Sequence, residues 1–393
     1  MKKMNLIQYV RTCFDTFDQL PFNEVDAAVL SQMAYLYIEE NFDNNFSDKG
    51  MSVDQLMRAE LFEEMCKTLP LQEELTQLIF AFVSSPRYRD ARIKYYRNEL
   101  NSHINLQFSA VVYSFGDQMH CVCFRGTDKT FVGWKEDLLL FKDQATACQM
   151  MSVNYLNGVG PKLQGELYIT GHSKGGHLAS YSASHCQKDI QDRILHVYNL
   201  DGPGFNRFEL DYPGMLSIKD RITKFNPSES AVGDIMFSEV DSIIIKSAWK
   251  GFMSHSAFGW EIEDNHFVTT ENSHNLPKKI IKNINARAEN ATDEEISMFA
   301  EIFFGLFEAS DFYTYDELGT DRIQTVKLLT RSIRKTEPAK RKEMFRVLHE
   351  CLRGIPKNKP LSEDTSSDDN NDLDYLVNDI ETELFNQEYN LFL

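Results

Sequence analysis

The chain lacks the features that would place it in a membrane or among metalloproteins. No stretch of its 393 residues approaches the roughly 18 uninterrupted apolar residues that a membrane span needs. The N-terminal segment has no continuous apolar run of signal-peptide length before Arg11. Its seven cysteines are scattered without CxxC pairing, and HExxH and Walker motifs are missing. We therefore expect a soluble, cytoplasmic protein with reduced thiols, no cofactor and no metal.

Positive charge is also scarce. The chain carries 59 acidic residues against 41 lysines and arginines, a formal net charge of -18. Binding to nucleic acid requires clustered cations, so this balance argues against a nucleic-acid partner. Ten of the acidic residues, and no lysine or arginine, lie from Leu361 to the end of the sequence. Residues 361–393 are therefore predicted to be a solvated, flexible acidic tail.

The hydrophobic pattern changes its period twice along the chain. Residues 23–98 show helical spacing, and from Phe108 the segment FSAVVYSFGDQMHCVCFRGT predicts two strands joined at Gly116-Asp117. Further short apolar strands, GELYITGHS, LHVYNL, RITKFN and SIIIKSA, alternate with helical segments as far as Val268. This alternation predicts an α/β fold with a mostly parallel sheet. From Thr292 the spacing is helical again and opens with a Thr-x-x-Glu capping box.

One short segment, YITGHSKGGHLA, carries a serine with glycine two places away on each side. Ser173 follows a predicted strand and precedes a helix rich in small residues, with Gly171 and Gly175 at the flanking positions. Such a turn exposes a serine hydroxyl above the edge of a sheet, and the glycines avoid a Cβ clash. The context favours a nucleophile elbow over an ordinary serine cap at a helix N-terminus.

Four segments taken together resemble a known family. They are FNEVDAAVLSQMAYL, CFRGTDKTFVGWKEDLLLF, GHSKGGHLA and NLDGPGFN, and they span most of the chain up to about Val268. As a set they resemble the Mbeg-like family of bacterial proteins, which is related to class 3 lipases. The resemblance implies an α/β-hydrolase fold with helical N- and C-terminal additions. It also implies that Arg125, Trp134 and Asp137 brace the loop that precedes the elbow.

The same resemblance implies a pair of oxyanion-hole residues. In class 3 lipases a small hydroxyl residue of the RG(S/T) turn acts with the backbone N–H that follows the nucleophile, and here these are Thr127 and Lys174. Thr127 after Gly126 is also consistent with a simple turn cap. The side chain of Lys174 differs from the apolar residue usual in secreted lipases. It either favours an acidic or phosphate-bearing substrate or faces solvent.

A serine nucleophile needs a histidine base, and chain order in this fold is serine, acid, histidine. His255 follows the last apolar strand and matches a similar H-x-x-F-x-W stretch in the Mbeg-like family, with His266 as the alternative. For the acid we favour Asp201, at the end of LHVYNL, because a carboxylate there faces the same crevice as the elbow. Glu229 and Asp234, one strand later, stay open as alternatives.

These observations predict a serine hydrolase of the esterase or lipase type, acting on an acyl ester through Ser173, His255 and Asp201. A small-molecule or lipid ester would be the partner. The expected organisation is a helical part at 1–100, the hydrolase core at 101–285, a C-terminal helical region at 286–360 and the tail at 361–393. Residues 205–221 are a candidate lid. The alternative is a non-catalytic protein that kept the fold and binds a partner or ligand.

Overall fold

The structure is a computed structural model that describes residues 3–38, 42, 46–67, 71–142, 144–271, 275–308 and 332–353. The predicted acidic tail lies outside the described residues. Among the described helices, none has the length and apolar character needed to cross a membrane.

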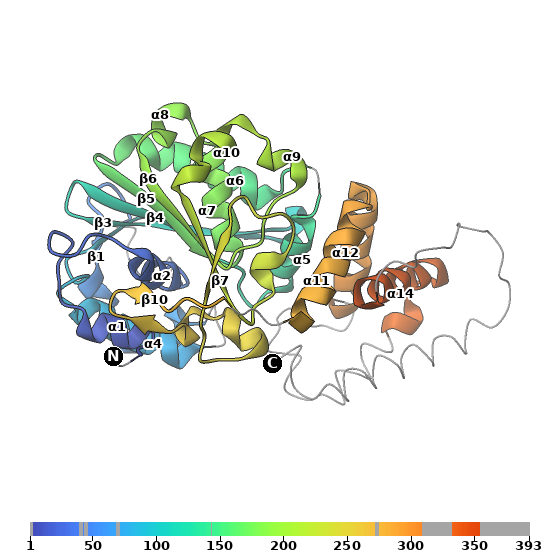
Figure 1. Cartoon of the computed structure of the whole chain (residues 1–393), viewed down its shortest axis with the longest axis horizontal. Coiled ribbons are helices and arrows are strands. Elements are labelled where there is room, and N and C mark those ends of the chain that lie inside the picture. Colours follow the sequence, from blue (N-terminus) through green and yellow to red (C-terminus); the bar gives the residue numbers. More distant parts are fainter. Residues whose placement is uncertain are drawn as a thin grey trace.

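An eight-stranded sheet lies at the centre of the molecule (Figure 1). Its order is the sequence order, and β1 to β4 pair antiparallel whereas β4 to β8 pair parallel. A separate two-stranded sheet joins β9 and β10. The strands are β1 (Met51–Ser52), β2 (Arg92–Asn101), β3 (Leu106–Phe115), β4 (Met119–Phe124), β5 (Glu166–His172), β6 (Ile194–Leu200), β7 (Ile222–Pro227), β8 (Ser242–Ile245), β9 (Ile262–Glu263) and β10 (His266–Phe267).

Helices cover both faces of this sheet, with α1, α2 and α4 on one face and α6, α7 and α10 on the other (Figure 1). The described α-helices are α1 (Leu6–Thr12), α2 (Glu24–Met33), α3 (Phe62–Met65), α4 (Gln72–Ser84), α5 (Phe131–Leu139), α6 (Ala147–Val159), α7 (Lys174–His185), α8 (Lys188–Gln191), α9 (Arg207–Leu210), α10 (Pro213–Ile218), α11 (Asn275–Glu289), α12 (Asp293–Glu308) and α14 (Pro338–Arg353). Two short 3-10 turns matter for the site, η6 (Val232–Asp234) and η7 (Gly251–His255).

The central strands are buried on both faces, because successive side chains point to opposite sides of the sheet and helices cover both sides. On β3, Phe108, Ala110 and Val112 enter the core under α6 and α7. Val111 and Tyr113, between them in sequence, enter the core under α1, α2 and α4. This is the α/β-hydrolase architecture that the sequence predicted, with a mostly parallel sheet between two helical layers.

Most of the predicted strands and helices are confirmed. Residues 53–65, within the segment expected to be helical, instead form two short 3-10 turns, η1 (Val53–Leu56) and η2 (Ala59–Leu61), and the four-residue helix α3. The hairpin of β3 and β4 turns at Gly116, whose φ of 65° suits a residue without Cβ. The capping box before α12 is present, because Thr292 and Glu295 exchange side-chain-to-backbone hydrogen bonds. The helical spacing expected as far as Asn98 is wrong over its last part, since β2 begins at Arg92. Antiparallel pairing with β3 overrides the local pattern there.

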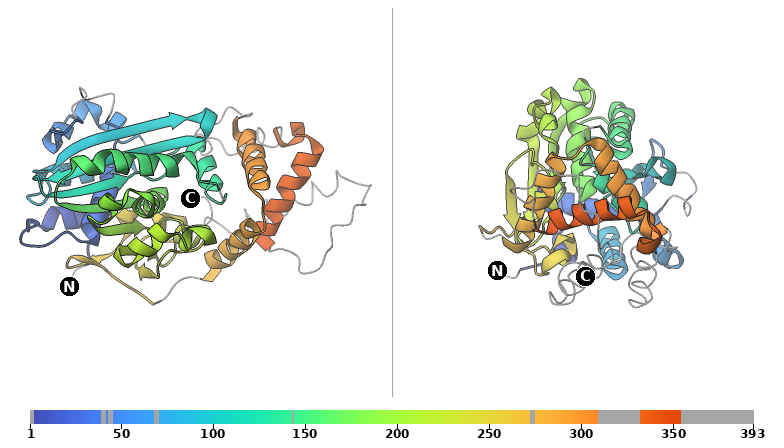
Figure 2. Two further views of the ribbon diagram at one scale, coloured as in Figure 1. Left: turned by 90° about the horizontal axis from the view of Figure 1, so that it is seen from above. Right: turned by 90° about the vertical axis from the view of Figure 1, so that its right-hand side faces the viewer.

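The carboxyl ends of the parallel strands meet at one edge of the sheet, and the C-terminal helices lie beside it. Figure 2 shows α11, α12 and α14 beyond one end of the strands. The loop after β4 leads into α5, which contacts α12. The loop after β7 contains η6, which is followed by residues that contact α11. Ligands in open α/β sheets bind outside this edge, so it is the place to look for a site.

Candidate active site

Ser173 occupies a strained turn between β5 and α7. Its φ of 60° and ψ of -132° lie in a region that residues with a Cβ rarely adopt. The turn has no room for side chains: a Cβ on Gly171 would lie 2.1 Å from the carbonyl oxygen of Gly175, and one on Gly175 would lie 2.1 Å from that of Phe124. The side chain of Ser173 is half-buried between buried neighbours. This geometry has the form of a nucleophile elbow.

Asp201 and His255 are in direct contact beside this turn. Asp201 directly follows β6 and is buried, with a φ of 52°. Its Oδ2 lies 2.6 Å from Nδ1 of His255, and its Oδ1 accepts a hydrogen bond of 3.0 Å from the backbone N–H of Gly233. The ring of His255 packs against that of His172, the residue before Ser173, with centroids 4.5 Å apart. A carboxylate, an imidazole and the elbow serine therefore gather at one edge of the sheet.

The three alternative residues lie in other environments. Glu229 accepts a hydrogen bond of 3.0 Å from the backbone N–H of Gly251, at the start of the turn that carries His255. Asp234 lies on η6, where its backbone oxygen accepts a hydrogen bond from Asn285. His266 lies on β10 with an exposed side chain and pairs with Glu24. Asp201 is thus a candidate acid in direct contact with the imidazole of His255.

His172 supports His255 from below. The Nε2–H of His172 donates to the backbone oxygen of His255 over 2.7 Å, so its Nδ1, 3.2 Å from the hydroxyl of Tyr35, accepts from that group. Burial, and then the neighbouring imidazole of His255, lower the pKa of His172 to about 3. The ring is therefore neutral at physiological pH. It holds the backbone of His255 through a hydrogen bond and, being neutral, does not compete with the His255 imidazole for the carboxylate of Asp201.

Thr127 lies next to the elbow, on the loop that follows β4. A Cβ on Gly126 would come within 3.1 Å of the Cβ of Ser173, which shows how closely this loop approaches the serine. The Thr127 hydroxyl donates to Oδ2 of Asp137 over 2.6 Å. Burial raises the pKa of Asp137 to about 6, although Lys174 and the Thr127 hydroxyl act in the opposite direction. The hydroxyl proton of Thr127 is therefore directed at Asp137.

The side chain of Lys174 meets neither solvent nor a substrate space, which corrects both readings of it from the sequence. The residue is buried, and its Nζ donates to Oε2 of Glu136 at 2.9 Å and to both oxygens of Gln107. Burial disfavours the ammonium, but Glu136 and then Asp137 raise its pKa above the usual value. Glu136 also accepts from the backbone N–H groups of Gln107 and Cys148. A buried ion pair thus ties the start of α7 to α5.

The segment from Phe205 to Arg221, a candidate lid from the sequence, is packed into the core at some of its positions. Phe205 stacks on His177 with ring centroids 4.4 Å apart. Met215 and Ile218, on α10, are buried in the core beneath α7. Phe208, Tyr212 and Leu216 of the same segment are exposed, so the segment is anchored in the helical layer at some positions and open to solvent at others.

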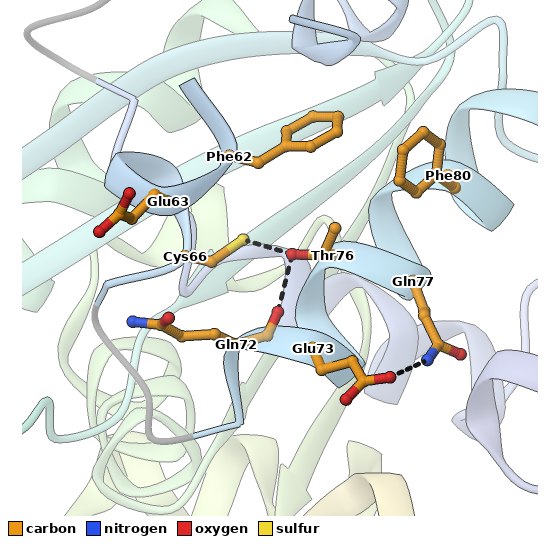
Figure 3. Close-up of a pocket in the computed structure, with 8 residues that line it drawn as sticks. All are labelled: Phe62, Glu63, Cys66, Gln72, Glu73, Thr76, Gln77 and Phe80. Atoms are coloured by element: carbon orange, nitrogen blue, oxygen red, sulfur yellow. Dashed lines mark hydrogen bonds between the residues drawn. The ribbon is translucent and has the colours of Figure 1, made fainter. Parts of the chain in front are cut away.

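A surface cleft of about 380 Å³ lies between α3 and α4 (Figure 3). Phe62 and Phe80 line one side, and the thiol of Cys66 lies 3.5 Å from the hydroxyl of Thr76. Burial raises the pKa of the Cys66 thiol, so the thiolate is disfavoured. None of the cleft's lining residues belongs to the elbow or contacts His255.

Two supporting residues, Tyr35 and Glu136, were not identified from the sequence. Tyr35 lies within the segment MAYL that contributed to the family resemblance, but nothing local indicates its contact with His172. Glu136 is one of several charged residues in GWKEDLLLF. That it is buried could not be predicted locally, because Lys174, Gln107 and the start of α6 surround it only in the folded chain.

Three lipases are among the solved structures to which the chain is similar. Among solved structures, M37 lipase is 18% identical over 54% of this chain and 69% of its own, with a TM-score of 0.34. Lip2 lipase from Yarrowia lipolytica is 14% identical over 58% of this chain and 80% of its own, also with a TM-score of 0.34. A triacylglycerol lipase from Penicillium expansum is 12% identical over 64% of this chain and 85% of its own, with a TM-score of 0.33.

A search of curated proteins finds no match. The family model of Mbeg1-like proteins matches residues 82–305, which is more than half of the chain and includes the elbow, Asp201, His255 and nearly all of α12. The chain therefore belongs to the Mbeg1-like family.

Proposed function

We propose that the protein is a serine hydrolase of the esterase or lipase type, which cleaves an acyl ester through a covalent acyl-enzyme. The observation that carries the proposal is the 2.6 Å contact between Asp201 and His255 at the same sheet edge as a serine held in a strained strand-to-helix turn. Strain of this kind persists where the surrounding structure enforces it, and it is concentrated at functional sites.

The geometry supports a division of roles among the three side chains. Asp201 accepts a hydrogen bond from the Nδ1–H of His255, which leaves the Nε2 lone pair to take the proton of the Ser173 hydroxyl. The serine oxygen then attacks the acyl carbonyl, and His255 returns the proton to the leaving alcohol. Water repeats the sequence on the acyl-enzyme and restores the serine.

Two backbone N–H groups are proposed to stabilise the oxyanion. Lys174 is the first residue of α7, where N–H groups have no partner within the helix and the helix dipole favours negative charge. Thr127 supplies the second, through its backbone N–H, because its hydroxyl donates to Asp137. The resemblance to class 3 lipases implied Thr127 as an oxyanion-hole residue, and here its backbone N–H is the proposed donor.

A fluorophosphonate probe tests the proposal directly. The wild-type chain is expected to be labelled and to hydrolyse short p-nitrophenyl esters, whereas Ser173→Ala does neither. Ser182→Ala is the matched control, since Ser182 is a buried serine of the same helix whose hydroxyl bonds to Ala179. Labelling that survives in Ser173→Ala, or no turnover by the wild type, would remove the enzyme hypothesis. A series of acyl lengths then defines the substrate.

The cleft between α3 and α4 favours a second candidate, a protein that binds a ligand without catalysis. In that case the fold would serve as a scaffold, and the two phenylalanines of the cleft would contact an apolar group. Binding that is lost in Phe80→Ala, in a chain that the fluorophosphonate does not label, would favour this candidate.

A further inference from the structure

The C-terminal helices α11 and α12 contact the two segments that lie directly behind the proposed catalytic groups. One contact is made by α11 on the loop after β7, and the other by α12 on the helix after β4. Both segments begin at the carboxyl ends of parallel strands, on either side of β5 and its elbow. The same C-terminal unit therefore touches the acid side and the oxyanion side of one site (Figure 2).

On the acid side the contact is a two-point amide clamp. The side-chain amide of Asn285, on α11, donates to the backbone oxygen of Asp234 over 3.0 Å and accepts from the backbone N–H of Met236 over 2.8 Å. The residue before Asp234 is Gly233, whose N–H holds Oδ1 of Asp201. Only one peptide unit separates the clamped backbone from the group that orients the carboxylate.

On the oxyanion side the contact is mainly apolar. Phe304 of α12 packs on Phe131 of α5 with ring centroids 6.2 Å apart, and both side chains are buried. Lys135, one turn further along α5, pairs with Glu301 at 3.1 Å, although the exposure of this pair makes its contribution small. The next residues of α5 are Glu136 and Asp137, which hold Lys174 and Thr127.

We propose that α11 and α12 form a clamp. Its positioning residues, Asn285 and Phe304, hold the loop after β7 and the helix α5 at fixed positions relative to Ser173. The proposal rests on the function proposed above and assigns a role to the helices that follow the hydrolase core. Catalytic groups must be held within fractions of an ångström, so second-layer supports of this kind influence the chemical step more than substrate binding. A displacement of about 1 Å costs as much as a hundredfold in rate.

The test compares Asn285→Ala and Phe304→Ala with two matched controls, one directly after α11 and one on α12. Asn290→Ala removes an asparagine that follows the last residue of α11 and whose side chain bonds back to Ala286 of that helix. Phe299→Ala removes a phenylalanine that packs toward α14 rather than α5. Ester hydrolysis is measured per active site, with the sites titrated by the fluorophosphonate, so that a smaller folded fraction does not lower the result.

We expect kcat per titrated site to fall about tenfold in Asn285→Ala and in Phe304→Ala, with KM within twofold of wild type. Phe304→Leu, which keeps an apolar contact, should recover most of the loss, and the two controls should stay within twofold. Amide hydrogen exchange in full-length protein should rise in peptides covering residues 228–237 for Asn285→Ala and residues 127–139 for Phe304→Ala.

Unchanged kcat per site together with unchanged exchange in both variants would overturn the clamp while leaving the hydrolase proposal intact. Equal losses in the controls would also overturn it, because they would indicate general destabilisation of the C-terminal helices. If the wild type shows no turnover that depends on Ser173, the proposed function falls and the rate effect falls with it.

Discussion

Replacing Asp201 by asparagine perturbs the proposed site with almost no change of volume. The two carboxylate oxygens accept from different donors, the Nδ1–H of His255 and the backbone N–H of Gly233. An asparagine has one oxygen for these two donors. If its oxygen stays with Gly233, the amide N–H₂ faces His255 and forces the ring proton onto Nε2. That tautomer cannot take the serine proton.

If the amide turns the other way, Gly233 loses a buried partner at a cost of about 1–3 kcal/mol. In both cases the negative charge that stabilises the imidazolium is lost. Substitutions of this type in a serine-histidine-aspartate triad lower kcat on the order of 10⁴-fold while the geometry stays intact. We expect a loss of about 10³ to 10⁴-fold in kcat for p-nitrophenyl ester hydrolysis by Asp201→Asn.

Glu229→Gln and Asp234→Asn serve as matched controls, since each neutralises a rival carboxylate without changing its size. The glutamine oxygen still accepts from Gly251, so we expect at most a fivefold effect on kcat in Glu229→Gln. A Glu229→Gln enzyme that loses 10³-fold, beside an Asp201→Asn enzyme within tenfold of wild type, would refute the reasoning. It would show that another carboxylate orients the histidine.

Three further predictions concern stability. Lys174→Met leaves Glu136 buried without its cation and should cost about 3–5 kcal/mol in the free energy of unfolding by urea, whereas Lys174→Met with Glu136→Gln should recover most of that loss. A single variant as stable as wild type would argue against a buried charged pair. Gly171→Ala, whose Cβ meets a backbone oxygen at 2.1 Å, should cost on the order of 3 kcal/mol and lower Tm by about 5 °C, or prevent folding. Gly158→Ala on α6, with open space around it, should be neutral or stabilising by up to about 1 kcal/mol. The pKa of His172 is lowered to about 3 in the folded chain, against about 6.5 in the unfolded chain. Between these values the unfolded state binds one more proton than the folded state. The free energy of unfolding therefore falls as the pH drops from about 6.5 towards 3, by at most about 1.4 kcal/mol per pH unit. His172→Gln should show a shallower pH dependence in urea unfolding between pH 7 and 4.5, and an unchanged slope would contradict a buried neutral imidazole.

The strands and the strand-to-helix turn at Ser173 could be predicted from the sequence because both depend on local rules. Short apolar segments separated by turn residues predict strands, and the hairpin at Gly116 and the strand before Ser173 are confirmed. The glycines around Ser173 also carry their own explanation, since a tight turn excludes a Cβ. The strand at Arg92–Asn101 was missed because pairing with β3, rather than local spacing, stabilises it.

The surroundings of the candidate site could not be predicted in the same way. Chain order allowed Asp201, Glu229 and Asp234 as partners of His255, and only the folded chain places one of them 2.6 Å from the imidazole. Nothing local distinguishes a lysine that faces solvent from one buried against Glu136. The segment 205–221 has the length of a lid, and only the folded chain shows that Met215 and Ile218 within it are buried in the core.

The sequence by itself determined the fold class and the serine turn, because backbone propensity, side-chain period and glycine sterics act over a few residues. The family was indicated by the resemblance of four segments. The tertiary structure decided which carboxylate meets the histidine, where the lysine charge is neutralised and which helices lie behind the site. Those outcomes depend on burial and on distances between residues far apart in the chain, where a hydrogen bond or ion pair forms only if the whole fold brings its partners together.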